Sequence, residues 1–169
     1  MQRVASLIGA DWMLPDSDAR ESVFNPSTGE VIAEVPFCTP DLIDRAVQSA
    51  KDAWPNWADT PVVERARVMF RFRELLERDL DELAAIVTRE HGKTRSEARA
   101  GILRGIEVVE FACGIPNLLM GTKLPNIAPQ VDAEAVRHPV GVCVGITPFN
   151  FPAMVPLWMF PIAITCGNT

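Results

Sequence analysis

The sequence has no tyrosine, only two histidines and only four cysteines among its 169 residues. The cysteines are widely spaced, and no two of them form a C-x-x-C pair. Zinc sites are usually built from four cysteine or histidine ligands at short spacings, so the sequence predicts no metal site. The same wide spacing favours free thiols in a reducing compartment over a disulfide framework.

Basic residues are also scarce. Lysine and arginine number 16 against 22 acidic residues, which gives a formal net charge of −6 at pH 7. Binding a polyanion requires clustered cations that neutralise phosphates, so the composition argues against a nucleic-acid partner. The first residues contain neither a long apolar segment nor an amphipathic leader rich in arginine and serine, and we expect a cytoplasmic protein.

Charge is missing altogether from residues 139–169. A stretch of this length could cross a bilayer, since about 20 apolar residues suffice. Five prolines interrupt it, however, and each one removes a backbone donor and obstructs a continuous helix. We therefore expect no membrane span and interpret the stretch as part of a buried core.

The N-terminal half carries clear turn and helix signals. A turn cluster at 25–29 precedes the strand-like residues 31–35, which predicts a small hairpin. Thr39 and the proline after it predict a helix start, and Pro55 predicts its end. Apolar residues then recur at helical spacing in segments that begin after Thr60, after Asp79 and near Ser96, with glycines at 92 and 114 as natural stops.

The C-terminal part predicts the entry into a sheet. Residues 122–130 look like a loop, and residues 131–137 alternate apolar and charged side chains, as a strand with one solvent-exposed face does. Residues 140–146 are apolar throughout, which is typical of a strand buried on both faces of a parallel sheet. Residues 151–166 are apolar on every side and predict a buried helix. The fold class is therefore α/β.

Two apparent motifs have ordinary explanations. Gly92-Lys93-Thr94 is reminiscent of a phosphate-binding loop, but the glycine required five residues earlier is Val87, and a helix rather than a strand precedes it. We interpret it as the end of a helix. Cys143 and Cys166 lie in apolar runs without a basic neighbour, which favours core residues over activated nucleophiles, and the other two cysteines have no better claim.

Two polar side chains each keep two interpretations. Arg104 is either a surface arginine paired with Glu107 or Glu110, or a planar donor for a substrate carboxylate. Asn150 follows the predicted buried strand, and ligands of open α/β sheets bind at the carboxyl ends of strands. It is either the N-cap of the following helix or a neutral donor to a developing oxyanion. Local spacing alone favours the first interpretation of each residue.

Residues 145–152, Gly-Ile-Thr-Pro-Phe-Asn-Phe-Pro, resemble a signature of the aldehyde dehydrogenase superfamily. Residues 24–30, 104–112, 153–161 and 166–169 are similar to one branch of it, the CoA-acylating methylmalonate-semialdehyde dehydrogenases. The resemblance covers nearly the whole chain. It implies an aldehyde dehydrogenase-like α/β fold, a homo-oligomer (a tetramer) and the NAD-dependent oxidation of a semialdehyde acid to an acyl-CoA, with coenzyme A as co-substrate.

The resemblance also implies roles for particular residues. Asn150 would stabilise the oxyanion, Thr147 and Phe149 would line the NAD site, and Arg104 would hold the substrate carboxylate. Residues 1–138 would form a helical region whose strand at 131–137 takes part in oligomerisation, and residues 139–169 would begin an NAD-binding, Rossmann-like domain that is incomplete here.

In that family the catalytic cysteine lies well beyond position 169. We therefore expect this chain to be the N-terminal part of such an enzyme and to be inactive by itself. Two alternatives remain open: a general NAD(P)-dependent aldehyde dehydrogenase fragment that hydrolyses its thioester, and a truncated product without enzymatic activity.

Overall fold

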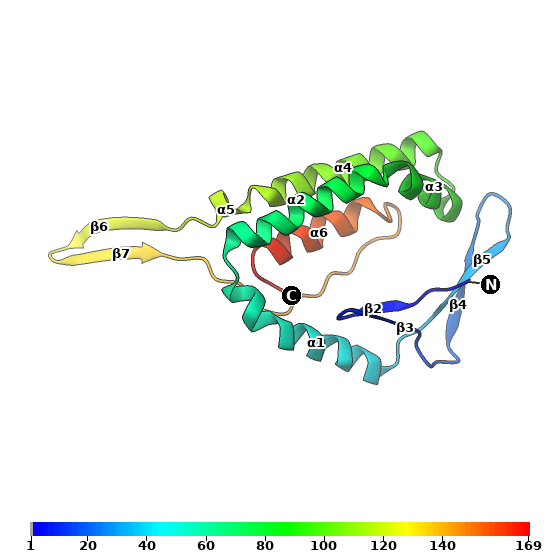
Figure 1. Cartoon of the computed structure of the whole chain (residues 1–169), viewed down its shortest axis with the longest axis horizontal. Coiled ribbons are helices and arrows are strands. Elements are labelled where there is room, and N and C mark those ends of the chain that lie inside the picture. Colours follow the sequence, from blue (N-terminus) through cyan, green and yellow to red (C-terminus); the bar gives the residue numbers. More distant parts are fainter. Residues whose placement is uncertain (1) are drawn as a thin grey trace.

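The computed structural model describes residues 2–169, which form an elongated body of helices with strands at one end and a long hairpin at the other (Figure 1). The helices are α1 (Pro40–Asp59), α2 (Val62–Arg78), α3 (Leu80–His91), α4 (Arg95–Cys113), α5 (Ile115–Leu118) and α6 (Met154–Thr165). The strands are β1 (Gln2–Arg3), β2 (Ser6–Ile8), β3 (Asp11–Met13), β4 (Arg20–Phe24), β5 (Val31–Pro36), β6 (Thr122–Ala128) and β7 (Val131–Ala135).

The predicted N-terminal hairpin is confirmed. Strands β4 and β5 pair antiparallel, and β1 joins the free edge of β5 in parallel. In the connecting turn the Asn25 side-chain oxygen accepts from the Ser27 amide, and Gly29 adopts the positive φ that glycine tolerates best. A second small hairpin, β2 with β3, was not predicted.

The helix boundaries mostly follow the local signals. Thr39 caps α1 through a bond from the Leu42 amide to its hydroxyl. Thr94 and Glu97 form a reciprocal capping box at the start of α4. Gly92 ends α3 in the left-handed conformation, which confirms that the Gly-Lys-Thr segment is a helix end.

The predicted end of α1 at Pro55 is wrong, because the helix continues to Asp59. Contacts from residues outside the helix hold the turn that follows the proline. The Trp57 indole N–H donates to the carbonyl of Ile164 at 2.8 Å, and Arg65 donates to the carbonyl of Ala58 at 3.1 Å. Such bonds from outside the helix offset the single backbone bond that a proline removes.

Helix α4 lies at the centre of the core and packs against α2, α3 and α6. Two apolar clusters meet on it: one joins α4 to α2, α5 and α6, and the other joins it to α3. The prediction that the last helix is buried on every side is wrong. Trp158, Met159 and Phe160 of α6 are about 40% exposed, because no element among residues 2–169 covers that face.

Helix α6 approaches α4 most closely at Gly105, where a Cβ atom would lie 2.6 Å from Cδ1 and 3.1 Å from Cβ of Leu157. We expect Gly105→Ala to push the two helices apart and to destabilise the chain by about 1–3 kcal/mol, as overpacked cores do. Gly101, one turn earlier, has no atom within 4 Å of such a Cβ. Gly101→Ala should therefore be neutral or stabilise the chain by up to about 1 kcal/mol through helix propensity. Urea unfolding of the two variants checks this, and equal midpoints would contradict it.

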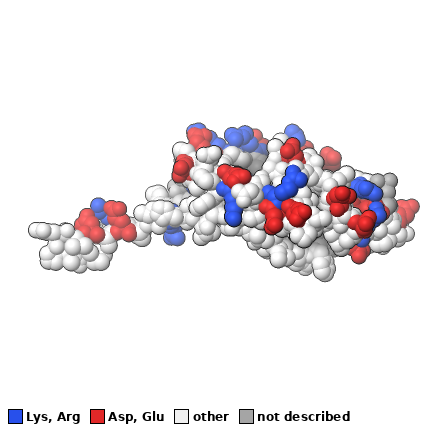
Figure 2. Space-filling view, turned by 90° about the horizontal axis from the view of Figure 1, so that it is seen from below, with Lys and Arg blue, Asp and Glu red and all other residues white. Residues whose placement is uncertain are grey.

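The hairpin of β6 and β7 corrects another prediction. Residues 122–128 form a strand rather than a loop, whereas the predicted strand that begins at Val131 is confirmed. The hairpin has no buried face: all seven residues of β6 are exposed, and in β7 only Ala133 is half-buried. Lys123 pairs with Asp132 and Glu134 at 3.2 Å, and Figure 2 shows an uncharged tip beyond these charges.

The predicted buried strand at 140–146 is also wrong as stated. Val140, Val144 and Ile146 are 83–87% exposed, and no strand is assigned there. Two residues bond to this segment. Asn168 Oδ1 accepts from the amides of Val140 at 2.8 Å and Gly141 at 3.1 Å. The Cys143 amide donates to the Thr169 carbonyl at 2.7 Å, and the Thr169 amide donates to the Gly141 carbonyl at 3.2 Å. This pattern is that of a parallel pairing. Within residues 2–169 the backbone pairing extends no further. Gly141 is buried and Val142 is half-buried, but residues 143–146 are exposed.

Candidate active-site loop

The residues whose function was predicted from the sequence lie before and beside α6. Thr147, Phe149 and Asn150 lie on the loop that joins the extended segment 140–146 to this helix, and all three are exposed, with Phe149 at 90%. The loop therefore presents an apolar ring, a hydroxyl and a carboxamide on the surface.

Asn150 is not the N-cap of α6. The helix begins at Met154, its N-cap position is Ala153, and no side chain caps it. Within residues 2–169 the Asn150 carboxamide makes no hydrogen bond. The capping interpretation that local spacing favoured is therefore wrong, and the side chain is left with its donor and acceptor groups uncommitted.

The backbone of Asn150, in contrast, is held. Lys93, which stands between α3 and α4, donates from Nζ to the Asn150 carbonyl at 2.7 Å. The same ammonium lies 3.7 Å from the centroid of the Phe151 ring. No role for Lys93 could be predicted from the sequence, because its contact partners lie 57 and 58 residues further along the chain. Its one local signal was the junction between two predicted helices.

Arg104 is exposed on α4, and the surface ion pair expected as an alternative is not formed in the described part of the chain. Glu110 instead accepts from Arg73 of α2 at 2.7 Å. The Arg104 carbonyl accepts from the Trp158 indole at 3.4 Å, so the residue lies beside the second turn of α6. Arg104 and the Asn150 loop thus meet the same helix.

None of the four cysteines has the setting of an activated thiolate. Burial raises the pKa of Cys113, and it raises the pKa of Cys166 in spite of the nearby Arg65 charge. Cys143 is exposed, so its predicted place in the core is wrong, because the segment that carries it is uncovered. Among residues 2–169 no group of three histidine, cysteine or acidic side chains could hold a metal ion.

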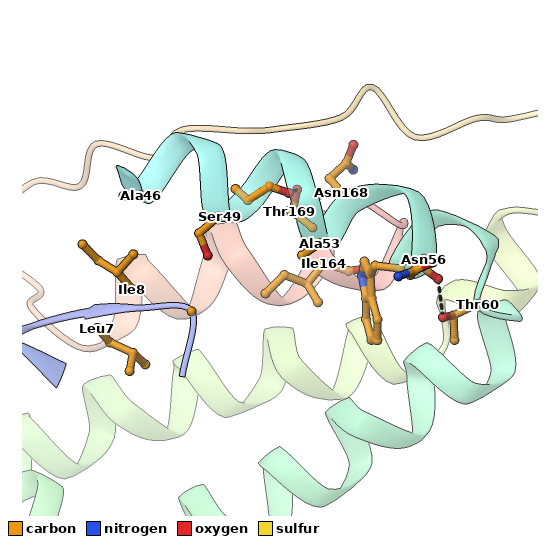
Figure 3. A pocket seen from close by; sticks show the side chains of 13 residues that line it. Leu7, Ile8, Ala46, Ser49, Ala53, Asn56, Thr60, Ile164, Asn168 and Thr169 are labelled. Carbon is orange, nitrogen blue, oxygen red and sulfur yellow. Dashed lines mark hydrogen bonds between the residues drawn. The ribbon is translucent and has the colours of Figure 1, made fainter. Parts of the chain in front are cut away.

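A groove lies between β2, α1 and the final residues (Figure 3). Leu7 and Ile8 form one wall of this groove, and Trp57 and Ile164 contribute to the rest. Its volume is about 850 Å³, but no acidic, basic, histidine or cysteine side chain lines it. The groove therefore offers hydroxyls but no side chain that could act as a general acid or base to activate them, and the candidate chemistry stays on the loop before α6.

Comparison with known sequences gives a consistent picture. The sequence model of the aldehyde dehydrogenase family matches residues 12–169. The chain is 50% identical over 169 residues to a malonate-semialdehyde dehydrogenase of Bacillus pumilus (strain SAFR-032), covering 100% of the chain and 35% of that protein. It is also 50% identical over 167 residues to the mitochondrial, acylating methylmalonate-semialdehyde dehydrogenase of Arabidopsis thaliana, covering 99% of the chain and 28% of that protein.

Solved structures agree in fold. A methylmalonate-semialdehyde dehydrogenase from Oceanimonas doudoroffii superimposes with a TM-score of 0.96 at 45% identity, over 99% of this chain and 34% of its own. A protein of Sinorhizobium meliloti 1021, complexed with NAD, gives a TM-score of 0.97 at 43% identity, over 100% of this chain and 34% of its own. The chain thus spans about a third of the length of these relatives, and it has their α/β fold. No helix in the part of the chain that is described is long and apolar enough to cross a membrane.

Proposed function

Because this chain belongs to the aldehyde dehydrogenase family, we propose that it forms the N-terminal third of an NAD-dependent, CoA-acylating semialdehyde dehydrogenase. The observation that carries the proposal is the state of Asn150: its carboxamide is exposed, caps no helix and stands on a loop whose backbone is anchored. The names of the relatives in Bacillus pumilus and Arabidopsis thaliana support malonate or methylmalonate semialdehyde as the substrate class.

In the proposed reaction a thiolate from the remaining part of the enzyme attacks the aldehyde carbon, and the carbonyl oxygen becomes an oxyanion. The Asn150 carboxamide donates a hydrogen bond to that oxygen, a contact that strengthens as the negative charge develops. Arg104 binds the carboxylate of the substrate through two parallel hydrogen bonds and so orients the aldehyde. NAD would supply the hydride acceptor for the resulting adduct, and coenzyme A would be the acceptor of the acyl group held on the sulfur.

The residues of the loop fit part of a dinucleotide. Phe149 offers an exposed apolar ring, and Thr147, two residues earlier, offers a hydroxyl. They would hold NAD, which supplies the hydride acceptor when bound, while the chain positions it. We propose that residues 139–169 begin the NAD-binding domain, since Thr169 pairs in parallel with residues 141–143 across α6.

The hairpin of β6 and β7 is an argument for a homo-oligomer. The family resemblance implies that this oligomer is a tetramer. Leu124 and Ile127 are 58% and 56% exposed, and Val131 and Val136 are 49% and 65% exposed, on a hairpin that extends away from the helices (Figure 1). Apolar side chains in such a position are stabilised when another protein surface covers them.

A chimera tests the proposed function. In it, residues 1–169 replace the corresponding third of the Bacillus pumilus relative, which is 50% identical over the whole chain. We expect NADH and an acyl-CoA to form from malonate semialdehyde, with acyl-CoA absent when coenzyme A is omitted. A folded chimera that forms a free acid at the same rate with and without coenzyme A would favour a general aldehyde dehydrogenase. A folded chimera without any NADH production would favour a non-enzymatic chain.

Arg104 determines the substrate class in this proposal. Arg104→Leu in the chimera should raise KM for malonate semialdehyde about 10- to 150-fold, because a charge-assisted hydrogen bond is worth roughly 1.5–3 kcal/mol. Propanal, which has no carboxylate, should be oxidised as before.

The matched control for Arg104 is Arg99→Leu. Arg99 lies on the same helix and pairs with Asp81 at 3.4 Å with both side chains well exposed, so its loss should leave both substrates unaffected. Equal losses for the two substrates in Arg104→Leu would contradict the assigned role.

A further inference from the structure

Lys93 makes contact with two consecutive residues of the candidate active-site loop. Its ammonium donates to the Asn150 carbonyl at 2.7 Å and lies 3.7 Å from the Phe151 ring centroid, well within the range of a cation–π contact. Among the hydrogen bonds within residues 2–169, this is the one that reaches residues 147–150.

The backbone on both sides of Lys93 is fixed. Gly92 closes α3 with a φ of +81° and a bond from its amide to the Thr88 carbonyl at 2.9 Å. Its Cα approaches the Pro26 ring so closely that a Cβ atom would lie 2.9 Å from Pro26 Cγ. On the other side, the Thr94 hydroxyl and the Glu97 carboxylate form the capping box of α4. The lysine therefore extends from a rigid junction.

The loop itself has little else to hold it. Thr147, Pro148, Phe149 and Asn150 are all exposed, and the Asn150 side chain makes no internal bond in the described residues. A carboxamide that stabilises an oxyanion must be held in place before the charge develops, because reorganisation at that moment would cost free energy. Something must therefore fix the backbone from which it projects.

We propose that Lys93 is a positioning residue for Asn150, holding the Asn150–Phe151 backbone so that the carboxamide points at the developing oxyanion. The proposal rests on the proposed function of Asn150. Lys93 acts through the loop and touches neither the substrate nor the cofactor. A small displacement of a catalytic group can cost on the order of a hundredfold in rate, so Lys93→Ala should lower kcat by roughly 10- to 100-fold.

A double-mutant cycle in the chimera tests the proposal. Lys93→Ala should lower kcat and leave KM for NAD unchanged, and Lys93→Arg should restore most of the rate, since a guanidinium can make both contacts. In the Asn150→Ala background, Lys93→Ala should have almost no further effect on kcat, because the group it positions is already gone. A merely structural lysine would lower kcat by the same factor in both backgrounds, which would overturn the proposal.

A control variant and a proteolysis experiment distinguish the anchoring role of Lys93 from the proposed function of Asn150. Lys51→Ala, at an exposed position on α1, should change nothing. In the 169-residue chain, Lys93→Ala should increase chymotrypsin cleavage after Phe149 while cleavage after Trp12, on the distant strand β3, stays constant. Unchanged cleavage after Phe149 would overturn the anchoring role. A normal kcat in the Asn150→Ala chimera would instead refute the proposed function of Asn150.

Discussion

Asn150→Ala in the chimera is expected to lower kcat about 100- to 1000-fold, the usual cost of removing one donor from an oxyanion hole. The affinity for NAD should remain nearly unchanged, because the lost bond exists only once the thiolate has attacked. Steady-state rates give kcat, and a titration of the protein fluorescence with NAD gives the affinity.

The structure supplies a matched control for this variant. Asn117 is an exposed asparagine on α5, and Asn117→Ala should leave both kcat and the NAD affinity unaltered. A normal kcat in the Asn150→Ala chimera would show that Asn150 is an ordinary loop residue without a catalytic role. A parallel loss of NAD affinity would indicate that the carboxamide binds the cofactor rather than the oxyanion.

Arg65→Met is expected to cause a large loss of stability. Arg65 is only 6% exposed, and burial lowers its pKa. Its guanidinium donates to the carbonyls of Ala58, in the last turn of α1, and of Thr60, directly after that helix. From Nε it donates to the carbonyl of Thr165 at the end of α6, at 2.9 Å. It thus joins the C-terminal ends of two helices that are far apart in sequence.

Each charge-assisted bond contributes about 1.5–3 kcal/mol, so the loss of two or more of them should destabilise the chain by about 3 kcal/mol or more. Methionine fills a similar volume but leaves those carbonyls without a donor. The control is Arg67→Met, on the exposed face of α2, where the pair with Glu64 should contribute only about 0–1 kcal/mol. Urea unfolding measures the stability of both variants. A loss below about 1 kcal/mol for Arg65→Met would contradict the proposed role of Arg65 in joining the ends of α1 and α6.

The features of the fold that the sequence predicted correctly are set within one or two helical turns. Thr39 and Thr94 each cap a helix through a bond to an amide three residues ahead, and Gly92 ends one because it adopts a positive φ easily. The turn at 25–29 likewise closes on its own residues. Such signals need no information from the rest of the chain.

The incorrect predictions concern segments whose state depends on distant partners. The turn after Pro55 is held by Ile164 and Arg65, which local patterns do not reveal. Strand β6 contains Pro125 and has Asn126 at a φ of 55°, both of which suggest a loop, yet its pairing with β7 accommodates them through a register shift. Residues 140–146 are apolar enough for a buried strand, but within residues 2–169 Thr169 alone pairs with them through its backbone.

In the candidate site, too, some residues could be predicted from the sequence and others could not. Its loop residues could be identified from the sequence because they resemble a family signature, whereas local spacing alone favoured a helix cap for Asn150. The structure removed that alternative by placing the start of α6 at Met154. Lys93 could not be found from the sequence, since its contact with Asn150 joins two segments 57 residues apart.

In the proposed reaction Asn150 donates to the oxygen of the reacting carbonyl. The most direct measurement is a crystal structure of the chimera with NAD and a bound semialdehyde analogue that mimics the tetrahedral intermediate. The distance from the Asn150 carboxamide nitrogen to the oxyanion should be about 2.7–3.1 Å, with Lys93 still on the Asn150 carbonyl. A carboxamide that points away from that oxygen, with another donor in its place, would contradict the claim.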